Sequence, residues 1–185
     1  MSLELLGGRI LAPYFGSSIY VWGSIITVFM LSLSFGYLIG GRWSVNHASL
    51  KRFGWIFIGG GLLMFPLVLF AQPLMNLVFE AIEDPRFGSL VAGLILFTVP
   101  TIILGMISPY SVRLVVENVA HSGEVAGRLY FFSTLGSALG TLLTSFYFVL
   151  WFEINTILIV LTSTLVCLGL IAIAIHIQTT KATHV

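Results

Sequence analysis

Five long apolar stretches follow one another along the chain, separated by short polar segments. A helix that crosses a bilayer needs about 20 mostly apolar residues, and a membrane β-strand would instead alternate apolar and polar positions. The stretches are apolar on every side and cover 17–41, 53–78, 89–107, 129–152 and 155–177. The pattern therefore predicts an all-α fold, a polytopic transmembrane helical bundle with five full spans, in a single transmembrane domain over residues 1–185.

The first residues form a shorter apolar segment ahead of these spans. Residues 1–11 are apolar apart from Glu4 and Arg9, and as a helix they cover roughly half a bilayer at about 1.5 Å per residue. Two interpretations remain open: an interfacial helix, or a half-span that is a truncated first span with its upstream half missing. Pro13 cannot continue a helix ladder and Gly16 permits unusual backbone angles, so we expect the chain to reverse between them.

Composition narrows the class of protein further. Of the 185 residues, 58% are hydrophobic and only 8% are charged, whereas soluble domains are about 25% charged. A net charge of +1 gives no overall attraction to nucleic acid. An ordinary cytosolic enzyme, a disordered chain and a nucleic-acid binder are therefore excluded, and the lipid bilayer is the expected partner.

The distribution of Lys and Arg predicts an orientation. Six of the eight basic residues fall in the segment between spans one and two, the segment between spans three and four, or the tail. Glu80, Glu83 and Asp84 lie in the loop between spans two and three, which is expected on the other side. By the positive-inside rule, we expect a bacterial inner-membrane protein with a cytoplasmic C-terminus.

The segment 108–128 is the longest one outside the spans. Its valines recur at spacings of three to four, which is typical of an amphipathic helix, and His121, Ser122 and Gly123 would end it. We expect a cytoplasmic amphipathic connection here. The candidate cytoplasmic docking residues are Arg42, Lys51, Arg52, Arg113 and Arg128.

Small residues recur at four-residue spacing in two spans. Such rows let helix backbones approach closely in lipid, so helix packing is expected, with a sliding surface for transport as the alternative. The residues are Ser32, Gly36 and Gly40 in the first span, and Gly136 and Gly140 in the fourth.

Ionisable side chains inside a membrane are functional candidates by default. Glu4 and Arg9, with Tyr14 and Tyr20 near the outer interface, form the candidate polar membrane site. The alternative is that Glu4 and Arg9 only extend their charged ends to the outer headgroups.

Motifs for catalysis are missing from the sequence. The chain has one Asp and contains no HExxH, GxSxG or CxxC motif and no glycine-rich nucleotide loop. Its histidines show no metal-ligand spacing. We therefore predict no catalytic residue, no metal site, no cofactor and no enzymatic activity.

Four motifs resemble the membrane region of the fused spermidine synthase family, often called MFS-like spermidine synthases. They are ELLGGRILAPYFGSSIYVW from Glu4, LSFGYLIGGR from Leu33, GMISPYSVR from Gly105 and GRLYFFSTLGSALGT from Gly127. The similarity covers residues 2–152. It implies a membrane helical domain that precedes a cytoplasmic aminopropyltransferase-like domain. That second domain has no counterpart in this chain, which also begins inside what looks like the first helix of the family.

Three functions remain open. The first is a non-enzymatic membrane subunit or anchor for a separately encoded synthase-like protein. The second is a small-solute or polyamine-related transporter that acts as a homo-oligomer. The third is an accessory structural subunit of a larger membrane complex.

Overall fold

The computed structural model describes residues 1–45, 48–116 and 122–182, and every regular element among them is helical. Five helices are long and apolar enough to cross a membrane, which confirms the predicted all-α bundle. These helices run over Ile19–Val45, Leu50–Ala81, Pro85–Val115, Ser122–Trp151 and Ile154–Thr180. The chain is therefore a membrane protein with five candidate spans.

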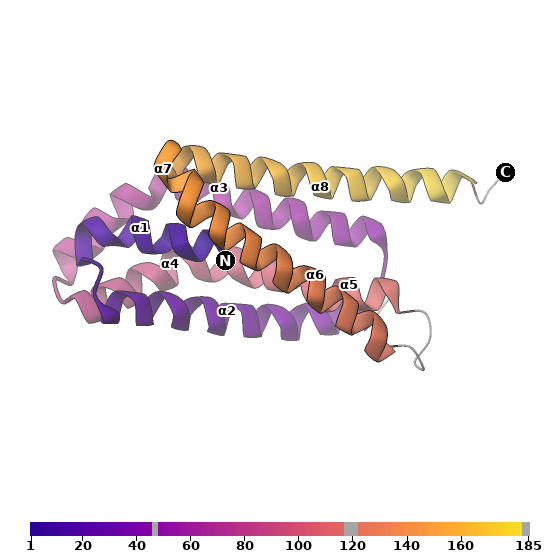
Figure 1. The fold of residues 1–185 in the computed structure, drawn as a ribbon, viewed down its shortest axis with the longest axis horizontal. Coiled ribbons are helices and arrows are strands. Elements are labelled where there is room, and N and C mark those ends of the chain that lie inside the picture. The colour runs from indigo at the N-terminus through magenta and orange to yellow at the C-terminus, as the bar shows by residue number, and fades with distance from the viewer. Residues whose placement is uncertain (46–47, 117–121, 183–185) are drawn as a thin grey trace.

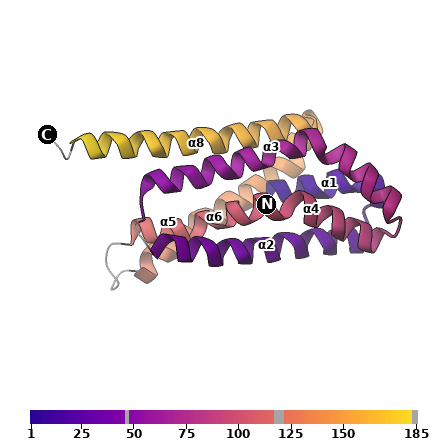
Figure 2. The same ribbon diagram turned by 180° about the vertical axis from the view of Figure 1, so that it is seen from behind.

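Successive spans run in alternating directions along the bundle (Figures 1 and 2). The elements are α1 (Ser2–Phe15), α2 (Ile19–Val45), α3 (Leu50–Ala81), α4 (Pro85–Gly105), α5 (Ile107–Val115), α6 (Ser122–Leu143), the π-helical turn η2 (Thr144–Phe148), α7 (Val149–Trp151) and α8 (Ile154–Ala182). The two ends of the bundle differ in charge. We call the end where α3 ends and α4 and α8 begin the acidic end, after Glu80, Glu83, Asp84 and Glu153, and the opposite end the basic end.

Local sequence explains several helix boundaries. Ser49 begins α3 by accepting a hydrogen bond from the Arg52 backbone N–H at 3.3 Å, and Asp84 begins α4 by accepting one from the Arg86 N–H at 2.8 Å. Gly16 ends α1 with a φ of 77°, a left-handed conformation that glycine adopts without strain. The expectation that Pro13 starts this turn is wrong, because α1 continues to Phe15 and its last turn is closed by a 2.9 Å bond from the Gly16 N–H to the Ala12 carbonyl.

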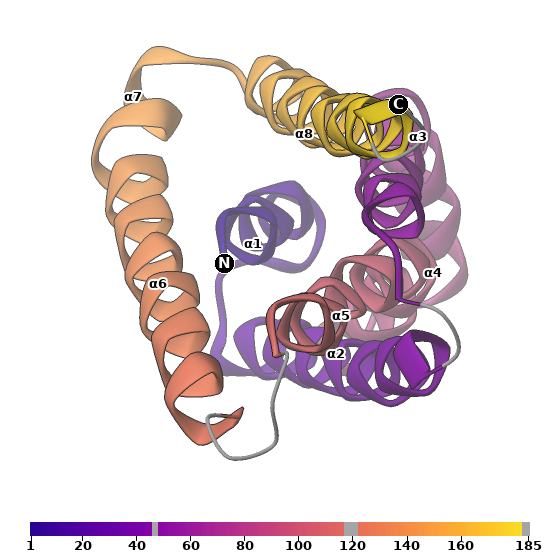
Figure 3. The ribbon, with the colours of Figure 1, turned by 90° about the vertical axis from the view of Figure 1, so that its right-hand side faces the viewer.

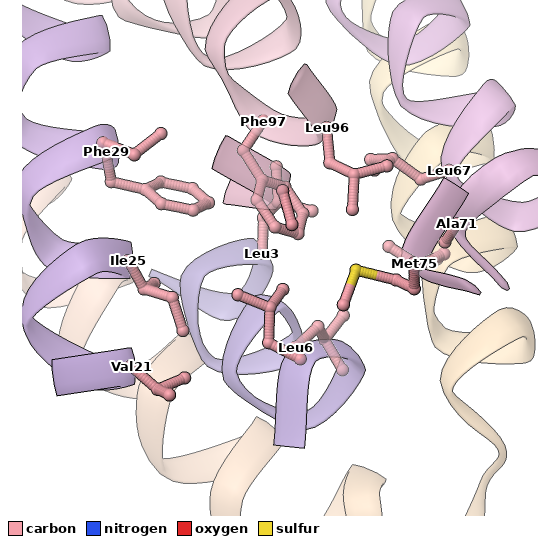
Figure 4. Close-up of a cluster of buried hydrophobic side chains, with 14 of the residues drawn as sticks. Leu3, Leu6, Val21, Ile25, Phe29, Leu67, Ala71, Met75, Leu96 and Phe97 are labelled. Atoms are coloured by element: carbon pink, nitrogen blue, oxygen red, sulfur yellow. The ribbon is translucent and has the colours of Figure 1, made fainter. Parts of the chain in front are cut away.

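Helix α1 lies inside the bundle rather than along its surface. Leu6 and Leu11 are fully buried, and they belong to one hydrophobic core with side chains of α2, α3, α4 and α8. Figure 4 shows Leu3 and Leu6 of α1 among the core side chains of neighbouring helices. The interfacial-helix interpretation of the N-terminal segment is therefore wrong, since the segment packs as a buried half-span.

The small residues of α2 bring its backbone against α4 and the start of α5. A Cβ atom built on Gly36 would lie 2.8 Å from the Gly105 Cα, and one on Gly40 would lie 2.6 Å from the Met106 Cα. Ser32 is buried on the same face. This confirms the predicted packing for the first row of small residues.

The predicted amphipathic connection differs from the structure. Its helical part is α5, which ends at Val115, and Val116 is already extended. Ser122 does not end a helix but begins α6, so Arg128 belongs to a span. Residues 117–121, including His121, lie outside the described residues. The predicted helical bounds are therefore wrong, and Val115 of the predicted apolar face is exposed.

Two adjacent glycines of α2 test the close approach. We expect Gly40→Val to destabilise the protein by about 1–3 kcal/mol, because the new side chain overlaps the Met106 backbone. Gly41→Val is the matched control, since no atom of the described residues lies within 4 Å of its Cβ position, and we expect a change within about 0.5 kcal/mol. Thermal unfolding in detergent measures both. Equal effects of the two substitutions would contradict the packing described.

Candidate functional site

A cleft of about 390 Å³ opens at the acidic end between α1, α3 and the start of α8. We call it the Arg9 cleft. Its polar lining residues are Arg9, Tyr14, Gln72, Glu153 and Asn155. Its apolar lining residues are Ile10, Pro13, Leu67, Val68, Ala71, Met75, Phe152 and Ile154. Apolar walls with a few convergent polar groups are typical of ligand pockets.

Three elements position the polar groups of this cleft. Helix α1 turns Leu6 and Leu11 into the core and leaves Arg9 exposed on another face. The Tyr14 ring packs edge-on against Phe79 of α3, with the ring centroids 6.2 Å apart. Glu153 stands at the corner between α7 and α8, and its carbonyl accepts the first bond of α8, from the Ile157 N–H at 3.1 Å.

The structure separates the four residues of the predicted polar membrane site. Arg9 and Tyr14 line the same cleft, but Glu4 does not line it. Tyr20 lies in a different cleft with Glu83 and Asp84, where the Arg86 guanidinium carbon stands 4.6 Å from the centre of its ring. The prediction that these four residues form one site is wrong, because Tyr20 follows the Gly16 turn and belongs to α2.

Three polar residues of the Arg9 cleft were missed at the sequence level. Gln72 is a polar side chain within an otherwise apolar span, beside Pro73, and this was the available signal. Glu153 and Asn155 flank the break between two spans, where polar residues are ordinary. Nothing in the sequence placed that break beside α1, so only the packing of the helices reveals the shared cleft.

The candidate docking residues gather at the basic end. Arg42 lies near the end of α2, Lys51 and Arg52 in the first turn of α3, Arg113 near the end of α5 and Arg128 early in α6, all with exposed side chains. Tyr110 braces this end from inside. It is fully buried, its ring stacks on Phe53 at 5.9 Å, and its hydroxyl accepts a 3.2 Å bond from the Ser49 N–H.

Helix α6 stands apart from the rest of the bundle (Figure 3). None of its residues is buried, and no atom of the described residues lies within 4 Å of a Cβ built on Gly136. A Cβ built on Gly140 would lie 3.3 Å from the Ser2 hydroxyl of α1. Within this chain the predicted helix packing is therefore wrong for Gly136, whereas Gly140 packs against Ser2 of α1.

A second cleft, of about 470 Å³, separates the α6 side from α2 and α5. We call it the α6 cleft. It is lined by Met1, Tyr37, Ser108, Pro109, Tyr130, Ser133, Thr134 and Ser137. Just beyond it, the Thr144 hydroxyl donates a 2.9 Å bond to the Ser2 hydroxyl, which itself donates to the Gly140 carbonyl at 3.3 Å. These hydroxyl contacts tie α1 to the far half of the α6 span.

Within the described residues, no three His, Cys, Asp or Glu side chains come together as a metal site would require. Comparison of the chain with family models, with curated proteins and with solved structures finds no match. The resemblance to the fused spermidine synthase family and the predicted lack of catalysis therefore stay predictions.

Proposed function

We propose that this chain is a non-enzymatic membrane subunit whose bundle is completed by a partner membrane protein along α6. The observation that supports the proposal is the uneven packing of the spans. In an 18-residue apolar stretch of the α6 span, only 6% is buried inside the chain, whereas the corresponding shares in the other four spans are 22–44%. In lipid, helices associate through close packing and interhelical hydrogen bonds, and α6 makes few of either within its own chain.

The side chains along the α6 cleft favour a protein partner over lipid tails. Ser133, Thr134 and Ser137 place a row of hydroxyl groups on this side of α6. In hydrocarbon a helical hydroxyl can bond only to its own helix, as Thr141 does to the Ser137 carbonyl at 2.8 Å. A second helix supplies further backbone and side-chain acceptors. Gly136 beside this row leaves room for close approach.

The same cleft gives little support to polyamine transport. Among the described residues, its lining contains hydroxyl and aromatic groups and no carboxylate, whereas a multiply charged cation inside a membrane requires opposite charges. The five exposed cationic residues of the basic end fit the subunit function better. They offer a surface for the separately encoded synthase-like protein that the family resemblance implies.

Site-directed photocrosslinking tests the partner at α6. In a Cys167→Ser background, Gly136→Cys and Gly23→Cys each carry a benzophenone maleimide in native membranes. Both positions have open space around the Cβ within the chain, but Gly23 lies on α2, so it is the matched control. We expect a discrete protein adduct from Gly136 and none from Gly23. Identical results from the two positions would remove the support for a partner at α6.

A bulky residue at the same position provides a functional check. We expect Gly136→Trp to abolish the higher-mass complex in native electrophoresis, because the indole occupies the close-approach face. Gly23→Trp should leave the complex intact. A complex that survives Gly136→Trp contradicts docking on this face.

The orientation is tested by cysteine accessibility. We propose that the basic end faces the cytoplasm of a bacterial inner membrane, with the C-terminus on the same side. In the Cys167→Ser background, an impermeant maleimide should label Glu83→Cys in intact spheroplasts and Lys51→Cys only after permeabilisation. Both side chains are exposed. The opposite labelling pattern would reverse the orientation.

The absence of catalysis is tested with the substrates of the family that the chain resembles. We expect the purified protein to leave decarboxylated S-adenosylmethionine and putrescine unchanged, because it lacks the acidic and nucleotide-binding groups that aminopropyl transfer needs. Chromatographic analysis of the amines measures this. Spermidine formation above the rate of a mock purification would contradict the proposal.

A further inference from the structure

The Arg9 cleft contains two opposite charges that do not pair with each other. Arg9 and Glu153 both line it, and both side chains are exposed. Across the described part of the chain, neither side chain forms an ion pair. Two opposite charges that line one cleft without pairing can each pair with a group of opposite sign on a single bound molecule.

The Arg9 side chain suits a phosphate. The planar guanidinium of Arg9 presents donors in a fork that matches phosphate oxygens.

The acceptor groups of the cleft suit a primary ammonium group. Glu153 supplies a carboxylate, and the Tyr14 hydroxyl and the Gln72 amide oxygen are further acceptors in the same lining. A primary ammonium has three N–H donors to share among such acceptors. A quaternary ammonium has none, so this arrangement distinguishes the two.

The apolar wall and the position of the cleft indicate a lipid. Leu67, Val68 and Met75 form part of the wall on α3, and Arg9 lies six residues before the end of α1, about 9 Å along the helix. The volume of about 390 Å³ lies within the usual range of ligand pockets, about 300–1,000 Å³. We propose that the Arg9 cleft binds the headgroup of a zwitterionic aminophospholipid, with its phosphate at Arg9 and its primary ammonium at Glu153.

Native mass spectrometry of the full chain tests this proposal. The purified protein is offered an equimolar mixture of phosphatidylethanolamine, phosphatidylcholine and phosphatidylglycerol in mild detergent, and the retained lipids are counted. We expect phosphatidylethanolamine to exceed each of the others by about tenfold, which corresponds to about 1.4 kcal/mol. Equal retention of the three lipids would overturn the proposal.

Single substitutions separate the two charges. Arg9→Gln should reduce phosphatidylethanolamine retention about tenfold, and Arg9→Lys should restore part of it. Glu153→Gln removes only the proposed ammonium site, so the lipid preference should shift toward phosphatidylglycerol. Because Glu153 lies at an exposed corner, this variant tests the proposal even if Arg9→Gln does not fold. Arg86→Gln is the control, because Arg86 lies in the other cleft of the acidic end. An Arg9→Gln or Glu153→Gln protein that folds with an unchanged lipid profile would overturn the assignment.

A soluble zwitterion with the same groups is the other source of this chemistry. Calorimetric titration of the delipidated protein with phosphoethanolamine distinguishes the two sources. A heat of binding that is seen with the native protein and lost in Arg9→Gln would assign the site to a soluble ligand. That result would support recognition of a zwitterion but overturn the lipid assignment. Lipid retention without such heat supports the headgroup, and the absence of both overturns the proposal.

Discussion

The packing of α1 among α2, α3 and α4 holds the arrangement together. Leu6 and Leu11 contribute to the main core from the middle of the bundle, and Ser2 provides the hydroxyl contact to the α6 span. The same helix turns Arg9 and Tyr14 toward the acidic end. One short buried helix therefore sets the core, the attachment of α6 and the candidate ligand cleft.

The spans differ in how they satisfy the constraints of a bilayer. In hydrocarbon, helix association depends on packing rather than on the removal of apolar surface from water. Helices α2 and α4 pack closely at Gly36 and Gly105. Helices α3 and α8 pack closely at Gly54 and Gly169, where a Cβ on Gly54 would lie 2.6 Å from the Gly169 carbonyl oxygen. Helix α6 has glycines of the same kind with nothing packed against Gly136. This is the observation on which the proposed partner along α6 rests.

Charge differs between the two ends of the bundle. Exposed cationic side chains gather at the basic end, while the acidic end carries the mixed-charge cleft around Arg9 and Glu153. The two proposals rest on different residues, because the partner is proposed along α6 and the lipid in the Arg9 cleft. Each therefore stands or fails without the other.

The five spans and the all-α class followed from the sequence alone, because uninterrupted apolar runs of bilayer length leave the backbone no stable alternative to the helix in lipid. The sequence also located the Gly36 and Gly40 packing face and recognised Arg9 and Tyr14 as candidates. Tertiary structure decided that Gln72 and Glu153 join Arg9, that Tyr20 does not, and that Gly136 has no neighbour. Those outcomes depend on which helices lie side by side, and the apolar periodicity of a membrane span carries little information about its neighbours, since lipid-facing and protein-facing surfaces are equally apolar.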